Sequence, residues 1–77
     1  MEKIIELGDK LMLKPKIKIR LAELDKKQSD IYEKLKVTPQ QFSNWVQGKS
    51  APRLEMAFKL AKELNCKVDD LWEYKEG

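Results

Sequence analysis

The 77-residue sequence predicts one small all-α domain of five helices, preceded by an N-terminal arm. Apolar residues recur at spacings of three and four from Ile17 onward, as in helices with one buried face. Strong helix-start and helix-stop signals bracket residues 38–48. A chain of this length has room for one core and little else. We therefore assign residues 1–16 to the arm and residues 17–77 to the domain.

The arm is best explained as two short strands. Residues 4–7 and 10–13 are mostly apolar, with Glu6 and Lys10 as the charged members, and between them Gly8-Asp9 suits a two-residue hairpin turn. The same apolar residues also fit a helical stripe interrupted by Gly8, and we favour the hairpin. Pro15 ends either element.

The first two helices of the domain are short. The first is expected from residue 17 to about residue 26, with Ile17, Leu21 and Leu24 on one face. The second is expected at residues 28–35, with Ile31 and Leu35 facing inward. Because few residues separate them, the two helices must cross at a steep angle.

The third helix, residues 38–47, has the clearest boundaries. Thr38 can cap the first turn, Pro39 fits the first helical position, and Gln41 completes the spacing of a capping box. Gly48 suits the left-handed residue that ends a helix. One apolar stripe is formed by Phe42, Trp45 and Val46.

The fourth helix is expected at residues 54–64, after a loop that contains Pro52. Its predicted core stripe consists of Leu54, Ala57, Phe58, Leu60, Ala61 and Leu64. Asn65 suits a left-handed C-terminal cap. Asp69 and Asp70 favour the start of a fifth helix, on which we place Leu71 and Trp72.

Composition argues against several classes of protein. The chain has no apolar run long enough to span a membrane and no signal-peptide pattern. It has no His and a single Cys, so neither a disulfide framework nor a metal-ligand cluster is expected. Without a nucleophile next to a base or a glycine-rich phosphate loop, we expect no enzyme activity and no cofactor. A reducing cytoplasm fits the cysteine content.

Charge is segregated along the chain, which has a net charge of +3. Residues 34–54 contain Lys34, Lys36, Lys49 and Arg53 but no Asp or Glu, whereas the C-terminal part is acidic. Such segregation is typical of a site for a polyanion. The alternative is an ordinary solvated surface of mixed charge.

The polar faces of the third helix carry no charge. They present Gln40, Gln41, Ser43, Asn44 and Gln47. Side chains with paired donors and acceptors suit the reading of base edges in a major groove. The alternative is a polar surface that recognises nothing.

In this order and with these gaps, the residues resemble the Cro/C1-type (XRE-type) helix-turn-helix family. The resemblance covers about Ile17 to Trp72 and is most specific from Val37-Thr38, through Phe42, Trp45 and Gly48-Lys49, to Pro52. It implies a lambda-repressor-like fold whose third helix enters the major groove of DNA. The chain departs from the family in having Tyr32 where a small residue is usual and Lys36 where Gly is usual.

The resemblance also assigns roles to side chains. Gln28 would contact a phosphate or brace a neighbour, the third-helix face would contact bases, and the residues after it would lie near phosphates. We therefore predict a DNA-binding site of ten residues: Gln28, Thr38, Gln40, Gln41, Ser43, Asn44, Gln47, Lys49, Ser50 and Arg53.

The function predicted from the sequence is a sequence-specific regulator of transcription that binds double-stranded DNA. We expect a bacterial or phage repressor that acts as a homodimer, with half-sites about one helical turn apart. The alternative is a protein-interaction module of the same fold, such as an anti-repressor or an antitoxin-like partner. The dimer surface is either the fifth helix with Trp72 or the arm pairing strand to strand.

Overall fold

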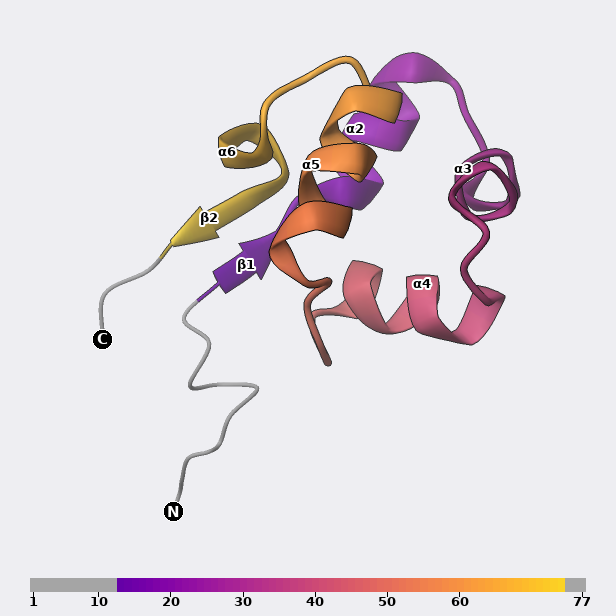
Figure 1. The fold of residues 1–77 in the computed structure, drawn as a ribbon. Helices are drawn as coiled ribbons and strands as arrows, with labels where there is room; N and C mark the ends of the chain where they lie inside the picture. The colour runs from indigo at the N-terminus through magenta and orange to yellow at the C-terminus, as the bar shows by residue number, and fades with distance from the viewer. Residues whose placement is uncertain (1–12, 75–77) are drawn as a thin grey trace.

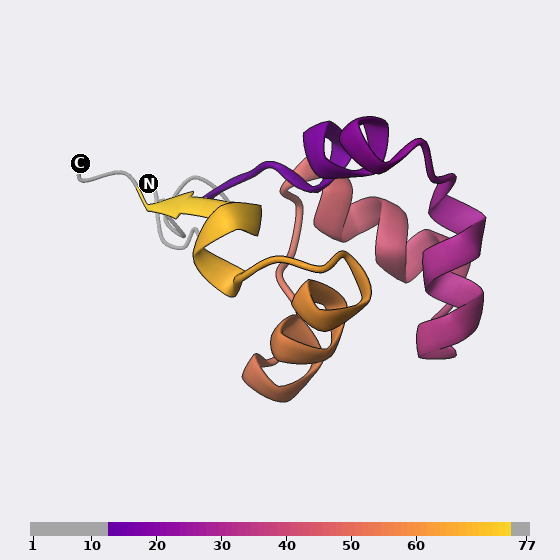
Figure 2. The same ribbon diagram turned by 90° about the horizontal axis from the view of Figure 1, so that it is seen from above.

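The computed structural model describes residues 13–74 of the chain. Within them the element order is β1 (Leu13–Pro15), α2 (Ile17–Leu24), α3 (Gln28–Leu35), α4 (Pro39–Gln47), α5 (Leu54–Glu63), α6 (Val68–Leu71) and β2 (Trp72–Tyr74). These five helices confirm the predicted fold class. In Figures 1 and 2 the two strands and α6 lie at one end of the domain, and α3 lies at the other.

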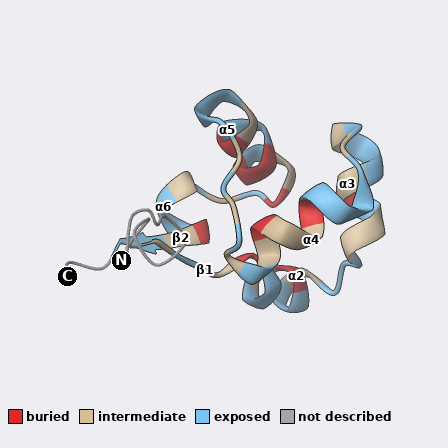
Figure 3. Ribbon diagram, turned by 90° about the horizontal axis from the view of Figure 1, so that it is seen from below, coloured by how far each residue is buried: buried red, intermediate tan, exposed pale blue. Residues whose placement is uncertain are grey.

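All five helices contribute side chains to one core. Its buried members are Ile17, Leu21, Ile31, Phe42, Trp45, Leu60, Ala61, Leu64 and Leu71. In Figure 3 the buried segments of the helices turn toward one another, and the exposed segments form the outside of the domain. The apolar residues at helical spacing thus form a single hydrophobic core, as a chain of this size requires.

A two-stranded antiparallel sheet joins the two ends of the described chain. Leu13 pairs with Tyr74, and Pro15 pairs with Trp72. The hairpin predicted around Gly8 lies outside the described residues. The placement of Trp72 on the last helix was wrong, because α6 stops at Leu71 and Trp72 adopts extended backbone angles. Pairing with β1 satisfies backbone groups that a four-residue helix leaves open.

The core stripe predicted for α5 was too wide. Ala57, Leu60 and Ala61 are buried, but the side chains of Leu54 and Phe58 are 72% and 60% exposed. Leu54 and Phe58 are four residues apart and therefore form one row, which lies beside the buried stripe and faces out. Helical spacing identified the apolar residues of α5 but did not identify which of them the other helices cover.

Left-handed residues make the tight joints between helices. Asp25 ends α2 with φ 56°, so this helix is two residues shorter than expected. Lys36 ends α3 with φ 60°, in the position where the family usually has Gly. Asn65 follows α5 with φ 55°, as predicted. The chain thus makes three of these turns without glycine, at a cost of order 1 kcal/mol each.

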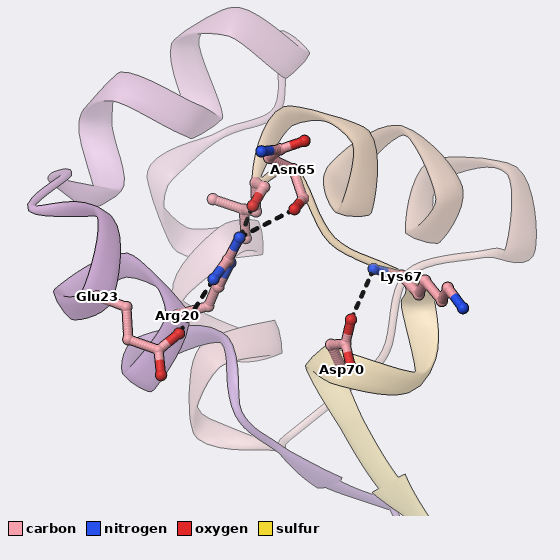
Figure 4. A network of polar contacts seen from close by, with 6 residues as sticks. Arg20, Glu23, Asn65, Lys67 and Asp70 are labelled. Carbon is pink, nitrogen blue, oxygen red and sulfur yellow. Dashed lines mark hydrogen bonds and ion pairs between the residues drawn. The ribbon is translucent and has the colours of Figure 1, made fainter.

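Arg20 on α2 ties that helix to the C-terminal end of α5 (Figure 4). Its Nε donates to the backbone oxygen of Leu64 at 2.9 Å, and its Nη2 donates to the backbone oxygen of Asn65 at 2.9 Å. Its Nη1 also contacts Glu23 at 3.2 Å. A cation therefore binds the two carbonyls that directly follow α5, at the negative end of the helix dipole.

Candidate nucleic-acid interface

The start of α4 is fixed by a side-chain cap. Thr38 Oγ1 accepts a hydrogen bond from the backbone N–H of Gln41 at 3.0 Å, and Pro39 occupies the first helical position. This is the Thr38 half of the predicted capping box. The Gln41 side chain is exposed, and no hydrogen bond from it is found among residues 13–74. Its amide is therefore available to a ligand.

Aromatic packing holds the inner face of α4. The side chains of Phe42 and Trp45 are 0% and 3% exposed. Their rings meet edge to face at a centroid distance of 5.9 Å. Tyr32 of α3 lies against Phe42 at 6.2 Å, so the larger residue at this position packs between α3 and α4. Rigid packing of one face keeps the opposite face in a fixed orientation.

Two hydrogen-bonded pairs order the polar face of α4. Gln40 Nε2 donates to Asn44 Oδ1 at 3.0 Å. Gln47 Nε2 donates to Ser43 Oγ at 2.8 Å. In each pair the partners are four residues apart, which is one helical turn. Each pair limits the rotamers of its glutamine before any ligand arrives, which lowers the entropy cost of binding.

The Gln40–Asn44 pair leaves useful groups free. After its bond to Asn44, the Gln40 amide still has one N–H and its carbonyl oxygen. A donor and an acceptor held side by side match the N7 and N6 edge of adenine in the major groove. The Asn44 side chain keeps its own N–H donors, so the pair can contact more than one base.

The end of α4 leads into a basic turn. Gly48 is left-handed with φ 81°, and the backbone N–H groups of Lys49 and Ser50 donate to the backbone oxygen of Asn44 at 2.9 and 3.4 Å. Lys49 is exposed after this turn, and Arg53 is exposed at the start of α5. Both cations lie beyond the helix end, where phosphate contacts would fix the position of the helix.

Gly48 also contacts the strand β1. A Cβ atom built at Gly48 would lie 3.3 Å from Pro15 Cδ and 3.4 Å from Pro15 Cγ. The position therefore needs glycine for two reasons: its positive φ and this close approach. The sequence signalled the first reason, but nothing in it signalled the contact with Pro15.

We expect Gly48→Ala to destabilise the domain by about 1–2 kcal/mol, because alanine is strained at positive φ and its methyl group presses on Pro15. Urea unfolding measures the loss. Gly48→Asn is the matched control and should cost less, because asparagine tolerates the left-handed region. In a Pro15→Ala background the cost of Gly48→Ala should fall. An alanine variant as stable as the parent would contradict this account.

Nine of the ten predicted site residues lie on α4, at its N-cap or in the segment after it, between Thr38 and Arg53. Gln28, the tenth, is the half-buried first residue of α3. In the described part of the chain no hydrogen bond joins its side chain to α4. Lys34, part of the basic segment, lies 3.5 Å from Glu63, so its charge is partly neutralised. Sequence reasoning missed both hydrogen-bonded pairs, although their four-residue spacing could have indicated them.

Other site types find little support within residues 13–74. This part of the chain contains no group of three or more Cys, Asp or Glu side chains placed to hold a metal ion. None of its helices has the length and apolar character needed to cross a bilayer.

The chain is similar to known proteins both in sequence and in structure. A family model described as Helix-turn-helix matches residues 17–71. The crystal structure of a "putative DNA-binding protein from Bacteroides fragilis" superposes with a TM-score of 0.75 at 31% sequence identity, covering 80% of this chain and 100% of that one. No curated protein matches the chain.

Proposed function

Since the chain belongs to the Cro/C1-type (XRE-type) helix-turn-helix family, we propose that it is a sequence-specific regulator of transcription that binds double-stranded DNA. Helix α4 enters the major groove and presents its polar face to the base edges. The observation that carries this proposal is the uncharged face of α4, with amides already ordered by hydrogen bonds. The Bacteroides fragilis structure, described as a "putative DNA-binding protein", supports the same assignment.

We expect Gln40 and Asn44 to make the contacts with base edges. Gln40 offers its free N–H and oxygen to an adenine, and the hydrogen bond to Asn44 restrains the Gln40 amide before this contact forms. Gln41 and Gln47 are exposed and Ser43 is half-buried, and we expect these three side chains to extend the contact surface on either side of the Gln40–Asn44 pair. We therefore expect an adenine at the base pair that faces Gln40.

We expect residues around the ends of α4 to contact the DNA phosphates. Lys49 and Arg53 are exposed after the helix, and the hydroxyls of Thr38 and Ser50 flank it. Each cation that neutralises a phosphate releases a counterion, so affinity should fall steeply as the salt concentration rises. Gln28 is assigned to a phosphate by family resemblance.

We further propose that the protein acts as a repressor and as a homodimer. A symmetric dimer places one α4 in each half-site, with half-sites about one helical turn apart. Occupying two successive turns of duplex would exclude other proteins from the same DNA.

Selection from random duplexes tests the proposal. We expect one enriched sequence, and we expect Gln40→Ala/Asn44→Ala to lower affinity for it about 10- to 100-fold, with little change for unrelated duplexes. Lys49→Ala should instead weaken binding to all duplexes and reduce the salt slope by about one. Lys67→Ala, an exposed lysine next to α6, is the matched control and should change neither. No enriched sequence, with unchanged binding by the double variant, would contradict base reading.

A second candidate is a protein-interaction module with the same fold. The observation that favours it is the exposed apolar pair Leu54 and Phe58 on α5. Salt separates the candidates, because DNA binding weakens steeply with salt and an apolar contact does not. A chain that ignores duplex DNA at low salt but binds a protein at high salt would support the second candidate.

A further inference from the structure

One surface of the domain is apolar without being part of the core. On α5 the side chains of Leu54 and Phe58 protrude, and at the nearby end of β2 the side chain of Tyr74 is 66% exposed. Large apolar side chains gathered on one side of a small domain are typical of an interaction surface. We call the exposed side of α5, together with Tyr74, the α5 face.

Hollows lie beside these protruding side chains. The first lies between the start of α5 and the strands, where Leu13, Pro52, Trp72 and Tyr74 line it. The second lies next to Phe58, between α5 and α6, and Ala61, Cys66 and Val68 contribute to its wall. The same face thus offers both protruding side chains and apolar hollows of a size to receive them.

A surface that carries both shapes can pack against itself. In a twofold interface each patch meets its own copy, so one patch must supply both the protruding side chain and the hollow that receives it. The charges of α5 fit the same arrangement. Glu55 lies at the start of the exposed side, where its Oε2 is also 3.9 Å from Lys59 Nζ of the same helix, and Lys62 lies near the end of that side. Two antiparallel copies of α5 therefore bring Glu55 and Lys62 together twice. Antiparallel helices also oppose their dipoles.

We propose that the α5 face binds a second copy of this chain, with two antiparallel α5 helices crossing near Phe58. Phe58 of each copy enters the hollow beside α6 of the other, and Glu55 of each copy faces Lys62 of the other. This interface rests on the proposed function, because a twofold operator needs two domains in fixed relation. The amide pairs lie on α4, a different helix from α5 (Figure 3), so the proposed interface does not use them.

The area of the face limits the strength of the dimer. A standard interface takes about 800 Å² from each partner, roughly a seventh of the 5337 Å² that one copy exposes. One helix face with an adjoining strand end is a small surface for such an interface. We therefore expect a dimer that forms at about micromolar concentration and that binding to a two-half-site duplex stabilises further.

Sedimentation equilibrium of the full chain tests the interface. We expect a monomer–dimer equilibrium whose dissociation constant rises at least tenfold in Phe58→Glu. The matched control is Ile19→Glu on α2, because the Ile19 side chain is also largely exposed, at 58%, and lies off the α5 face. This control should dimerise like the parent. Circular dichroism should show both variants folded, since neither residue is buried.

Two further measurements report the geometry. With Cys66→Ala removing the native thiol, Phe58→Cys should form a disulfide-linked dimer under mild oxidation, because the two α5 helices cross near position 58 and bring the two cysteines close to the twofold axis. Ile19→Cys in the same background should not. Glu55→Lys and Lys62→Glu should each weaken the dimer several-fold, and the double variant should restore it.

Three results would each overturn the interface. The parent chain could stay monomeric at every concentration, with and without a two-half-site duplex. Phe58→Glu could leave dimerisation unaffected, or the two charge reversals could fail to compensate each other. Unchanged dimerisation in Phe58→Glu would point to another surface, such as the strand edge. Binding to a duplex with a single half-site reports α4 independently. If that binding persists without a dimer, the proposed function stands and this interface fails.

Discussion

Phe42→Ala is expected to remove about 3–5 kcal/mol of stability, the cost of deleting a buried aromatic ring. The side chain of Phe42 is fully buried, and its ring contacts those of Tyr32 and Trp45. A domain of this size has a total stability of roughly 4–12 kcal/mol. The variant should therefore be partly or wholly unfolded at 25 °C. Far-ultraviolet circular dichroism with urea titration measures the loss.

Phe58→Ala is the control for this prediction. It makes the same chemical change on a side chain that is 60% exposed, and it should cost less than about 1 kcal/mol when measured on the monomer. Because Phe42 holds α4 against the core, DNA binding should disappear together with the fold in Phe42→Ala. Equal stability of the two variants would mean that Phe42 does not anchor α4.

The elements with strong local signals were predicted well. Helix α4 has a threonine cap, a proline at its first position and a glycine after its last residue, and the structure places all three as expected. The burial of Phe42 and Trp45 also follows directly from helical spacing, because both side chains lie on the same face of α4. Where capping, spacing and composition agree, the local sequence is enough to fix an element.

Features that depend on distant residues were not predicted. Trp72 forms a strand because β1 lies beside it, more than fifty residues earlier in the chain. Leu54 and Phe58 have the spacing of core residues, but within residues 13–74 no other helix covers their row. The residues next to Arg20 in the sequence do not reveal its bonds to Leu64 and Asn65. Periodicity describes one helix at a time, whereas coverage depends on how the helices are arranged.

The candidate site was predictable in outline only. The positions of the exposed side chains on α4 follow from its helical period. The pairing of Gln40 with Asn44 depends on rotamers, which the sequence does not specify. The closeness of Pro15 to Gly48 depends on the path of β1 across the domain.

Arg20→Ala is expected to cost about 2 kcal/mol, because two backbone oxygens at the end of α5 lose a charged donor. The side chain of Arg20 is 25% exposed, so water can replace part of what is lost. Arg20 also links α2 to α5, and its removal should loosen that joint. Urea unfolding of the parent and the variant measures the difference.

Two companion variants identify the source of the stability. Glu23→Ala breaks only the ion pair with Arg20, and since the Glu23 side chain is 59% exposed it should cost no more than about 0.5 kcal/mol. Arg20→Lys keeps the charge but cannot reach both oxygens at once, so it should fall between parent and alanine. If Glu23→Ala cost as much as Arg20→Ala, the ion pair and not the bonds to α5 would hold the two helices together. If lysine matched arginine, charge at the end of the helix would suffice. The intermediate result would show that the forked shape of the guanidinium, bound to two successive carbonyls, fixes the end of α5 against α2.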